Sequence, residues 1–217
     1  VIPEGFTLHN YVDLFTDSNF LASVGRSIAM CIIPIIVTIV IVLLALFVTA
    51  IYFPKLEKYV QIICMIPYTI QGVILSVSIL SLYVGSSSIL SNRLFMLMGA
   101  YCIVILPYIY QGIRNGMRAV NMPTLIEAAE MLGASKIYAF FRVVVPNILS
   151  AIIVSSLLAV GIIFGDYVLI RNLAGTSAPN MQIFLYQTMK SDSTKASAVF
   201  VVIMFVTFVI TAIVLFM

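Results

Sequence analysis

The amino-acid sequence predicts an all-α protein with several membrane-spanning helices. Of its 217 residues, 63% are hydrophobic and 9% are charged, whereas a soluble domain carries about 25% charged residues. The apolar residues gather in long runs, and within lipid each backbone amide must find its partner inside the protein. Helices satisfy that condition, and the runs lack the alternation of β-barrel strands. We therefore expect a polytopic helical membrane protein.

Five apolar runs are predicted to cross the bilayer, whose hydrocarbon core is about 30 Å thick. Pro34, Pro67 and Pro107 lie inside three of these runs, where a proline commonly kinks the helix. The five predicted spans cover approximately residues 27–53, 59–84, 94–113, 146–170 and 196–217.

The side chains needed for several kinds of chemistry are scarce. The three cysteines, Cys31, Cys64 and Cys102, lie in apolar runs without metal-ligand spacing, and His9 is the one histidine. We therefore expect no catalytic residue and no metal site. The 11 Lys and Arg against 8 Asp and Glu are scattered along the chain, so we expect no nucleic-acid partner.

A long segment at about residues 114–145 is neither a span nor a simple loop. Thr124 and Glu127 form a T-x-x-E capping box, which predicts a helix beginning near Leu125. Gly133 is placed to end that helix in a left-handed conformation. A second helix is predicted from Lys136 to Val145, capped by Ser135. The segment should therefore form a helix–turn–helix elbow between two spans.

The first helix of this elbow is predicted to offer a shallow face to another protein. Leu125, Ala128, Ala129 and Leu132 follow helical spacing. The two alanines would let another surface approach closely.

The same segment resembles the "EAA" signature of permease subunits of ATP-binding-cassette (ABC) importers. That signature reads E-A-A, three residues, Gly, nine residues and I-x-L-P. Here Glu127, Ala128 and Ala129 are followed after three residues by Gly133, and after nine more by the sequence VVVP at 143–146. Valines replace the Ile and Leu and keep their apolar character. The resemblance extends over essentially the whole chain, as one permease domain over 1–217 with an external loop at about 171–195.

The resemblance implies a type I ABC importer permease fold with the elbow in the cytoplasm. In that family the EAA helix is a coupling helix that docks on the ATPase, so Glu127, Ala128, Ala129 and Gly133 are the expected ATPase contacts. Such permeases usually have six spans, so we expect a further span before the five visible here. This topology gives an extracytoplasmic N-terminus and a cytoplasmic C-terminus in a bacterial plasma (inner) membrane.

The expected partners are two ATP-binding subunits, a second permease subunit of a different sequence, an extracytoplasmic substrate-binding protein and membrane lipid. No G-x-x-x-x-G-K-[ST] motif occurs in the sequence. We therefore expect no cofactor in this chain, with ATP bound by the partner subunits.

Polar residues inside the predicted spans are candidates for the translocation path. Asp166 is the one acid in a span, near its outer end; it could attract a cationic substrate, pair with Arg171 or cap the helix end. A short motif, P-Y-x-x-Q-G, occurs twice: it places Tyr68 and Gln71 in one span and Tyr108 and Gln111 in another. These four side chains could line the path or hold helices together. In the external loop, residues 181–189 are predicted to form a short amphipathic helix.

The sequence thus predicts a permease subunit of an ATP-driven importer and no enzyme. The chain looks most like spermidine/putrescine permeases, with ferric iron, phosphonate, thiamine and sugar as alternative substrate classes. A secondary transporter or channel is the alternative function, but it would need buried coupling charges and usually a repeat of spans. A membrane enzyme would need a nucleophile with a base, paired acids or metal ligands.

Overall fold

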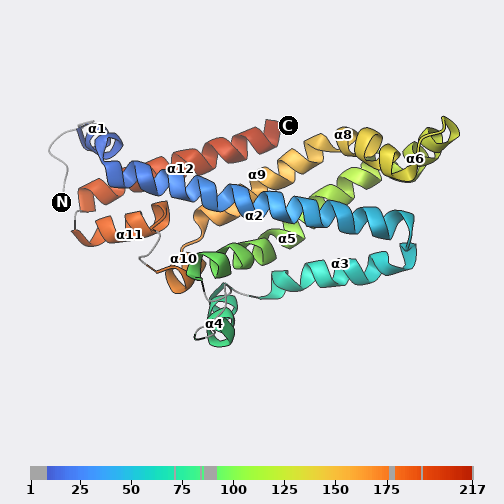
Figure 1. The fold of residues 1–217 in the computed structure, drawn as a ribbon. Helices are drawn as coiled ribbons and strands as arrows, with labels where there is room; N and C mark the ends of the chain where they lie inside the picture. Colours follow the sequence, from blue (N-terminus) through green and yellow to red (C-terminus); the bar gives the residue numbers. More distant parts are fainter. Residues whose placement is uncertain are drawn as a thin grey trace.

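The computed structural model describes residues 9–70, 72–83, 85, 92–175, 179–191 and 193–216. All regular structure in these ranges is helical. Four long helices run along a common direction and form a bundle (Figure 1). They are α2 (Ser18–Ile51), α5 (Arg93–Ala119), α9 (Leu149–Gly165) and α12 (Ser193–Phe216).

The middle of the bundle is built around α5, which contacts both α2 and α9. A stripe with one residue per helical turn points into the core: Leu97, Tyr101, Ile105, Ile109 and Ile113 are each at most 1% exposed. An apolar stripe with this spacing keeps one side of the helix against its neighbours along its full length.

The contact between α5 and α9 depends on small residues. A Cβ atom on Gly112 would lie 2.4 Å from the Cβ of Ser155, and one on Gly116 would lie 2.5 Å from the Cβ of Ala151. Both distances are far shorter than any normal carbon–carbon contact. The glycines therefore let the two helices approach closely, as small residues four apart do in membrane helix pairs.

Three of the predicted spans are confirmed as single helices. α2, α5 and α12 are each long and apolar enough to cross a membrane. Two bent helix pairs in the described residues could supply further spans, giving up to five.

The predicted span over 59–84 is a pair of helical segments with a sharp bend between them. The segment begins with the 3-10 turn η1 (Pro54–Leu56), α3 (Glu57–Met65) and the 3-10 turn η2 (Ile66–Thr69). α4 (Gly72–Tyr83) then leaves at 100° to the preceding part, and Figure 1 shows it turned away from the bundle. Pro67 lies in η2, where its missing amide and its ring favour a 3-10 turn over an α-helix, and the bend follows at Ile70, which is extended with ψ 113°.

The predicted span 146–170 is also more broken than expected. It begins within α8 (Val145–Asn147), the last part of a helical stretch, Lys136–Asn147, that meets α9 through Ile148 at a bend of 65°. α9 ends at Gly165, and a separate short helix, α10 (Val168–Leu173), follows. Pro146 lies in the first turn of α8 and Asp166 is extended, with ψ 124°, so the segment cannot be one straight helix.

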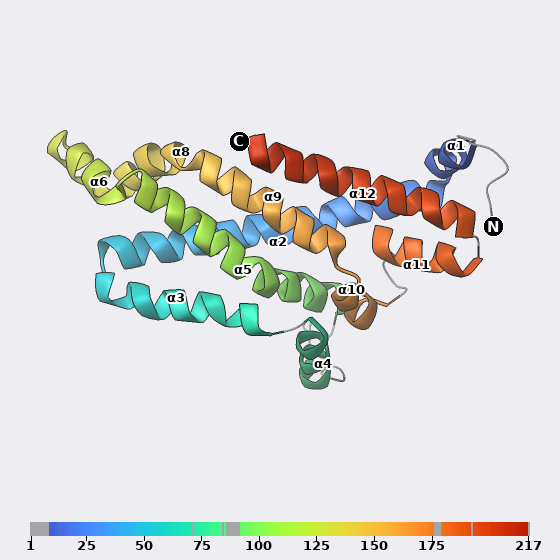
Figure 2. The same ribbon diagram turned by 180° about the vertical axis from the view of Figure 1, so that it is seen from behind.

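Two shorter helices lie at one end of the bundle, α1 (His9–Thr16) and α11 (Met181–Ser191) (Figure 2). The helix predicted over 181–189 is therefore confirmed, although Met189, predicted on its apolar face, is exposed. The backbone before α11 is held to α2, because Arg26 Nε donates to Pro179 O (2.9 Å) and Met181 N donates to Ser27 Oγ (3.0 Å). We call this the α11 end of the molecule; the opposite end holds the corner between α2 and α3.

Candidate functional site: an elbow at one end of the bundle

The predicted elbow is present and projects from the end opposite α11 (Figure 1). Its first helix is α6 (Met122–Met131), which follows α5 almost directly. The predicted capping box is wrong: α6 begins three residues before Leu125, and no side chain caps its N-terminus. Asn121, with φ 50°, reverses the chain in a left-handed conformation, and Pro123 supplies a fixed φ in the first turn.

The predicted end of the first elbow helix is confirmed. Gly133 has φ 86°, a conformation that glycine adopts without a steric penalty. Gly133 N donates to Glu130 O (2.9 Å) and Ala134 N donates to Ala129 O (3.0 Å). These two bonds form a Schellman cap, which satisfies carbonyls at the end of the helix and fixes its turn.

The second part of the elbow is capped as predicted but is not one regular helix. Tyr138 N donates to the Ser135 side chain (3.3 Å), which starts α7 (Lys136–Ala139). A π-helical turn, η4 (Phe140–Val144), then leads into α8. Ala139, Phe140 and Val144 are fully buried, so this irregular stretch packs firmly on the rest of the chain.

The predicted shallow face is divided between the interior and the surface. Ala129 is buried with Met122 and Ile126 on the side of α6 that packs on the chain itself. Ala128 and Glu127 are exposed, as is Gly133. The proposed ATPase contacts therefore point outward in three cases of four, with Ala129 packed inside.

Four large apolar side chains at the elbow are exposed, and of these only Leu132 was singled out from the sequence, as part of the shallow face. Met131 and Leu132 are 89% and 90% exposed, and Ile137 and Tyr138 are more than half exposed. We call these four residues the elbow tip. Their position directly around a glycine-capped helix end was the signal available in the sequence.

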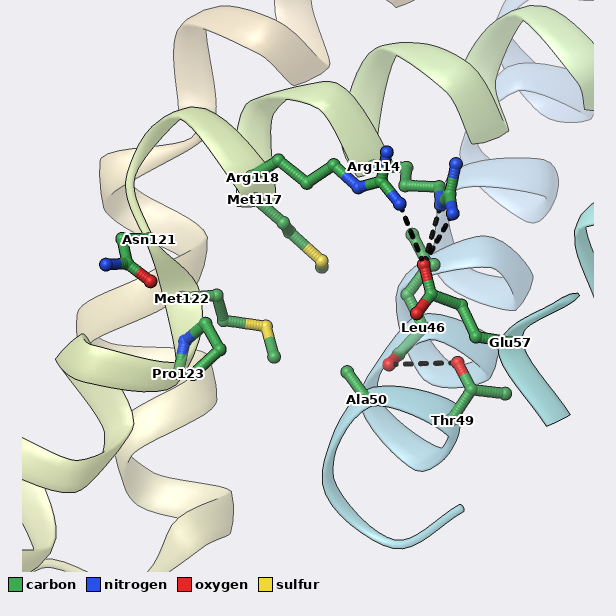
Figure 3. Close-up of a pocket in the computed structure, with 10 residues that line it drawn as sticks. All are labelled: Leu46, Thr49, Ala50, Glu57, Arg114, Met117, Arg118, Asn121, Met122 and Pro123. Carbon is green, nitrogen blue, oxygen red and sulfur yellow. Dashed lines mark hydrogen bonds and ion pairs between the residues drawn. The ribbon is translucent and has the colours of Figure 1, made fainter. Parts of the chain in front are cut away.

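An ion-pair cluster beside the elbow links the last turns of α5 to the start of α3 (Figure 3). Arg114, near the end of α5, contacts Glu57 at the start of α3 through Nε (2.8 Å) and Nη2 (2.6 Å). Arg118 reaches the same carboxylate at 3.5 Å. The cluster borders a cavity of about 290 Å³ that also touches Asn121 and Pro123. One carboxylate thus connects two helices beside the first residues of the elbow.

The two tyrosines of the repeated P-Y-x-x-Q-G motif lie side by side. The rings of Tyr68 and Tyr108 lie 4.9 Å apart, edge to face. Gln111 is exposed and donates to Met65 Sδ at 3.2 Å, while Gln71 lies outside the described residues. Tyr68 is exposed as well.

Asp166 has a clear structural role. Its side chain accepts from the backbone amides of Leu169 (3.1 Å) and Ile170 (3.4 Å), in the first turn of α10, and from Tyr101 Oη (3.3 Å). Of the two structural roles open from the sequence, the helix cap is therefore the one observed, and no ion pair with Arg171 is present among the described contacts of Asp166. Arg171 instead contacts Tyr167 and Tyr186.

The comparisons with known proteins agree with this architecture. The sequence model of the family "Binding-protein-dependent transport system inner membrane component" matches residues 56–217. A curated protein of Mycoplasma genitalium, "Probable ABC transporter permease protein MG188", is 23% identical over 94% of this chain and 69% of its own length.

Two solved structures have the same fold. One is a bacterial ABC transporter involved in the import of the acidic polysaccharide alginate, with a TM-score of 0.67, 17% identity and coverage of 99% of this chain and 83% of that one. The other is a bacterial alginate ABC transporter in complex with an alginate pentasaccharide-bound periplasmic protein, with a TM-score of 0.67, 16% identity and coverage of 97% and 81%. With three quarters of its length matched by the family model, this chain belongs to the inner membrane components of binding-protein-dependent ABC transport systems and is a permease rather than an enzyme.

Proposed function

We propose that this chain forms part of the translocation path of an ATP-driven importer in a bacterial plasma membrane. The elbow would lie in the cytoplasm and transmit the movement of a separate ATPase subunit to the spans. The α11 end would then face the outside.

The exposed elbow tip is the observation that supports this function best. Met131 and Leu132 hold a large apolar surface in water at the end of a well-capped helix. Such a surface is typical of a protein-binding site, because exposed apolar side chains at the centre of an interface supply much of its binding energy. The cap at Gly133 and the buried π-turn hold the tip rigidly on α5 and α9, so a push on it moves both helices.

The proposed assembly contains two ATP-binding subunits, a second permease subunit and an extracytoplasmic substrate-binding protein. ATP would be bound by the partner subunits, and this chain would supply Glu127, Ala128, Gly133 and the elbow tip as the contact. Ala129 would support that contact from inside. The binding-protein partner is supported by the related alginate transporter, whose structure includes a periplasmic protein.

The path across the membrane is proposed to pass the surface shared by η2 and α5. Tyr68, Tyr108 and Gln111 offer polar atoms on that surface, and Gln71 is proposed from the sequence alone. Asp166 would serve the path indirectly, by holding α10 in place.

The substrate class is proposed on two grounds that point in different directions. The sequence resemblance favours polyamines, with ferric iron, phosphonate, thiamine and sugars behind them. A solved transporter of the same fold is involved in the import of an acidic polysaccharide, and the charges at the α11 end favour an anionic solute.

The docking role of the elbow tip is tested by a double substitution, Met131→Asp with Leu132→Asp. Both side chains are about 90% exposed, so the substitutions should change folding stability by less than about 0.5 kcal/mol each. We expect the ATPase subunit to be lost when the complex is purified through this chain in mild detergent. Glu127→Arg should weaken the association in the same assay.

The control is Met189→Asp, which places a single aspartate on a side chain that is 63% exposed at the α11 end. This variant should retain the ATPase. Retention of the ATPase by the elbow-tip variant, in amounts equal to the control, would contradict the proposed function.

A further inference from the structure

A cavity of about 490 Å³ lies at the α11 end, between the start of α5 and helices α10 and α11. Its charged and aromatic lining residues are Arg93, Tyr167, Arg171, Tyr186 and Lys190. Cavities of this size commonly hold small molecules. The elbow and the ion-pair cluster lie at the opposite end of the molecule (Figure 2), so this cavity is separate from the docking surface.

The charges around the cavity are unbalanced. Arg93, Arg171 and Lys190 come from three different helices, and none of the described lining residues is acidic. None of these three cations has an acidic partner among the described residues. Two cations elsewhere in the described chain are neutralised, by contrast: Lys195 contacts Asp17 at 2.7 Å, and Arg114 contacts Glu57 at 2.6 Å. Three cations collected around one cavity create a local potential that attracts anions.

Aromatic rings hold two of these cations in place without neutralising them. The guanidinium carbon of Arg171 lies 4.6 Å from the centre of the Tyr186 ring and 5.5 Å from that of Tyr167. Lys190 Nζ lies 4.6 Å from the same Tyr186 ring. Cations ordered in this way lose less freedom when a ligand arrives. The planar guanidinium also keeps donors suited to a two-oxygen anion.

The positive potential acts on Tyr186 itself. Hydrogen bonds from Arg171 and from Lys190 lower the pKa of Tyr186 to about 8, against an ordinary value of about 10. The cavity therefore stabilises a negative oxygen even when that oxygen belongs to the protein.

We propose that this cavity is a binding site for a small solute that carries an oxyanion such as a carboxylate or a phosphonate. The inference rests on the proposed importer function, because the site would receive the solute on the outer side of the transporter. The same three cations would repel a polyamine. The inference thus selects acidic solutes from the substrate classes considered above.

The first experiment measures binding of small probes to the complete transporter in lipid nanodiscs by saturation-transfer NMR. The probes are D-galacturonate and 2-aminoethylphosphonate, with D-galactose and spermidine as neutral and cationic comparisons. We expect saturation of at least one of the two anionic probes and none of galactose or spermidine. The double variant Arg171→Gln with Lys190→Gln should abolish the signal.

The matched control is Lys55→Gln with Lys58→Gln, which removes two exposed positive charges from the opposite end. This variant has the same net charge as the cavity variant and should bind the anions as the wild type does. Equal loss of signal in both variants, or binding of spermidine in place of the anions, would overturn the proposal.

A second measurement places the probe in the cavity. An anion beside Arg171 and Lys190 should raise the pKa of Tyr186 from about 8 toward the ordinary value of about 10. At a pH between these values, the bound anion should therefore lower the tyrosinate absorbance, and Tyr186→Phe should remove that change. An anion that binds without changing the absorbance binds elsewhere, which would contradict the proposal.

Failure of this inference is distinguishable from failure of the proposed function. Co-purification of the ATPase does not involve the cavity residues, so it should be normal in the cavity variant. If the ATPase is present and the wild type binds neither anion, the importer function stands and the anion site does not. If the ATPase is absent from the wild-type preparation, the importer function itself is contradicted.

Discussion

Gly112 and Gly116 fix the distance between α5 and α9. A methyl group on either would approach a Cβ atom of α9 to 2.5 Å or less, and neither side chain opposite can rotate its Cβ away. We predict that Gly112→Ala and Gly116→Ala each lower the free energy of unfolding by about 1–3 kcal/mol, the usual cost of forcing extra atoms into a packed contact. Thermal unfolding in detergent would measure the loss.

Gly99 gives the control for this prediction, because it lies on the same helix with no atom within 4 Å of the place of a Cβ. Gly99→Ala should be neutral or stabilising by up to about 1 kcal/mol, since alanine favours the helix over glycine. If all three variants unfolded alike, the close contact would have no energetic role.

Single residues were predictable where the cause is local. Gly133 and Ser135 follow rules for helix ends that depend on a few neighbouring residues, and both predictions are confirmed. The Thr124–Glu127 capping box failed because Asn121 and Pro123 start α6 earlier. The spacing of Gly112 and Gly116 was visible in the sequence, but their partners on α9 are about 40 residues away and could be paired with them only in three dimensions.

Helices α3 and α5 are joined by Glu57 beside the elbow. Arg114 is 15% exposed and Glu57 36% exposed at the side chain, so Glu57→Gln would leave a largely buried guanidinium without its charge partner. We predict a loss of about 1–2 kcal/mol in unfolding free energy, between the values typical of exposed and of buried pairs. We further predict less solute transported per ATP hydrolysed, because the elbow would lose one connection to α3.

Reconstituted complexes in liposomes would give both quantities, ATP hydrolysis and transport. Lys58→Gln is the comparison, since Lys58 is exposed on the same turn and pairs with no acid in the described chain. A Glu57→Gln complex with wild-type transport per ATP would show that the ion pair has no part in coupling.

The long helices were predicted from the length of the apolar runs, but the positions of the bends between helices were not. α2, α5 and α12 stand where the apolar runs are long and uninterrupted. Pro34 and Pro107 lie inside intact helices, whereas Pro67 lies where a helix breaks. A proline therefore marks a possible bend, and the packing of the surrounding helices decides whether the bend is large.

The surface of the whole molecule is strongly apolar along the bundle. On α2, Ile28, Ile32, Ile36 and Val40 are each about half exposed, and on α12 Phe205 and Phe208 are more exposed still. These faces suit contact with lipid or with another apolar protein surface. Composition predicted such faces in general, yet which side of each helix they occupy depends on how the bundle packs.

At the α11 end, one ion pair ties together two helices far apart in sequence, with Lys195 of α12 contacting Asp17 at the start of α2. The bond to Lys195 lowers the pKa of Asp17 below its usual range. The folded protein therefore holds the ionised carboxylate more favourably than the unfolded chain does. The resulting stabilisation is present above the unfolded pKa of about 4 and is lost as the pH falls through the lower folded value.

We predict that the melting temperature of the wild type falls more steeply than that of Asp17→Asn below about pH 4. Near neutral pH the variant should be the less stable of the two. Parallel melting curves across the acidic range would show that the pair adds nothing to stability.

α5 is one uninterrupted helix of 27 residues, about 40 Å long, with Arg93 of the proposed anion site at one end and the elbow at the other. The solute and the ATPase would therefore bind at opposite ends of one helix, and the effect of each on the binding affinity of the other is reciprocal. Any factor by which ATPase docking changes the affinity for the solute must equal the factor by which the solute changes the affinity for the ATPase. Measuring either factor therefore determines the other, and substitutions that soften α5 should reduce both together.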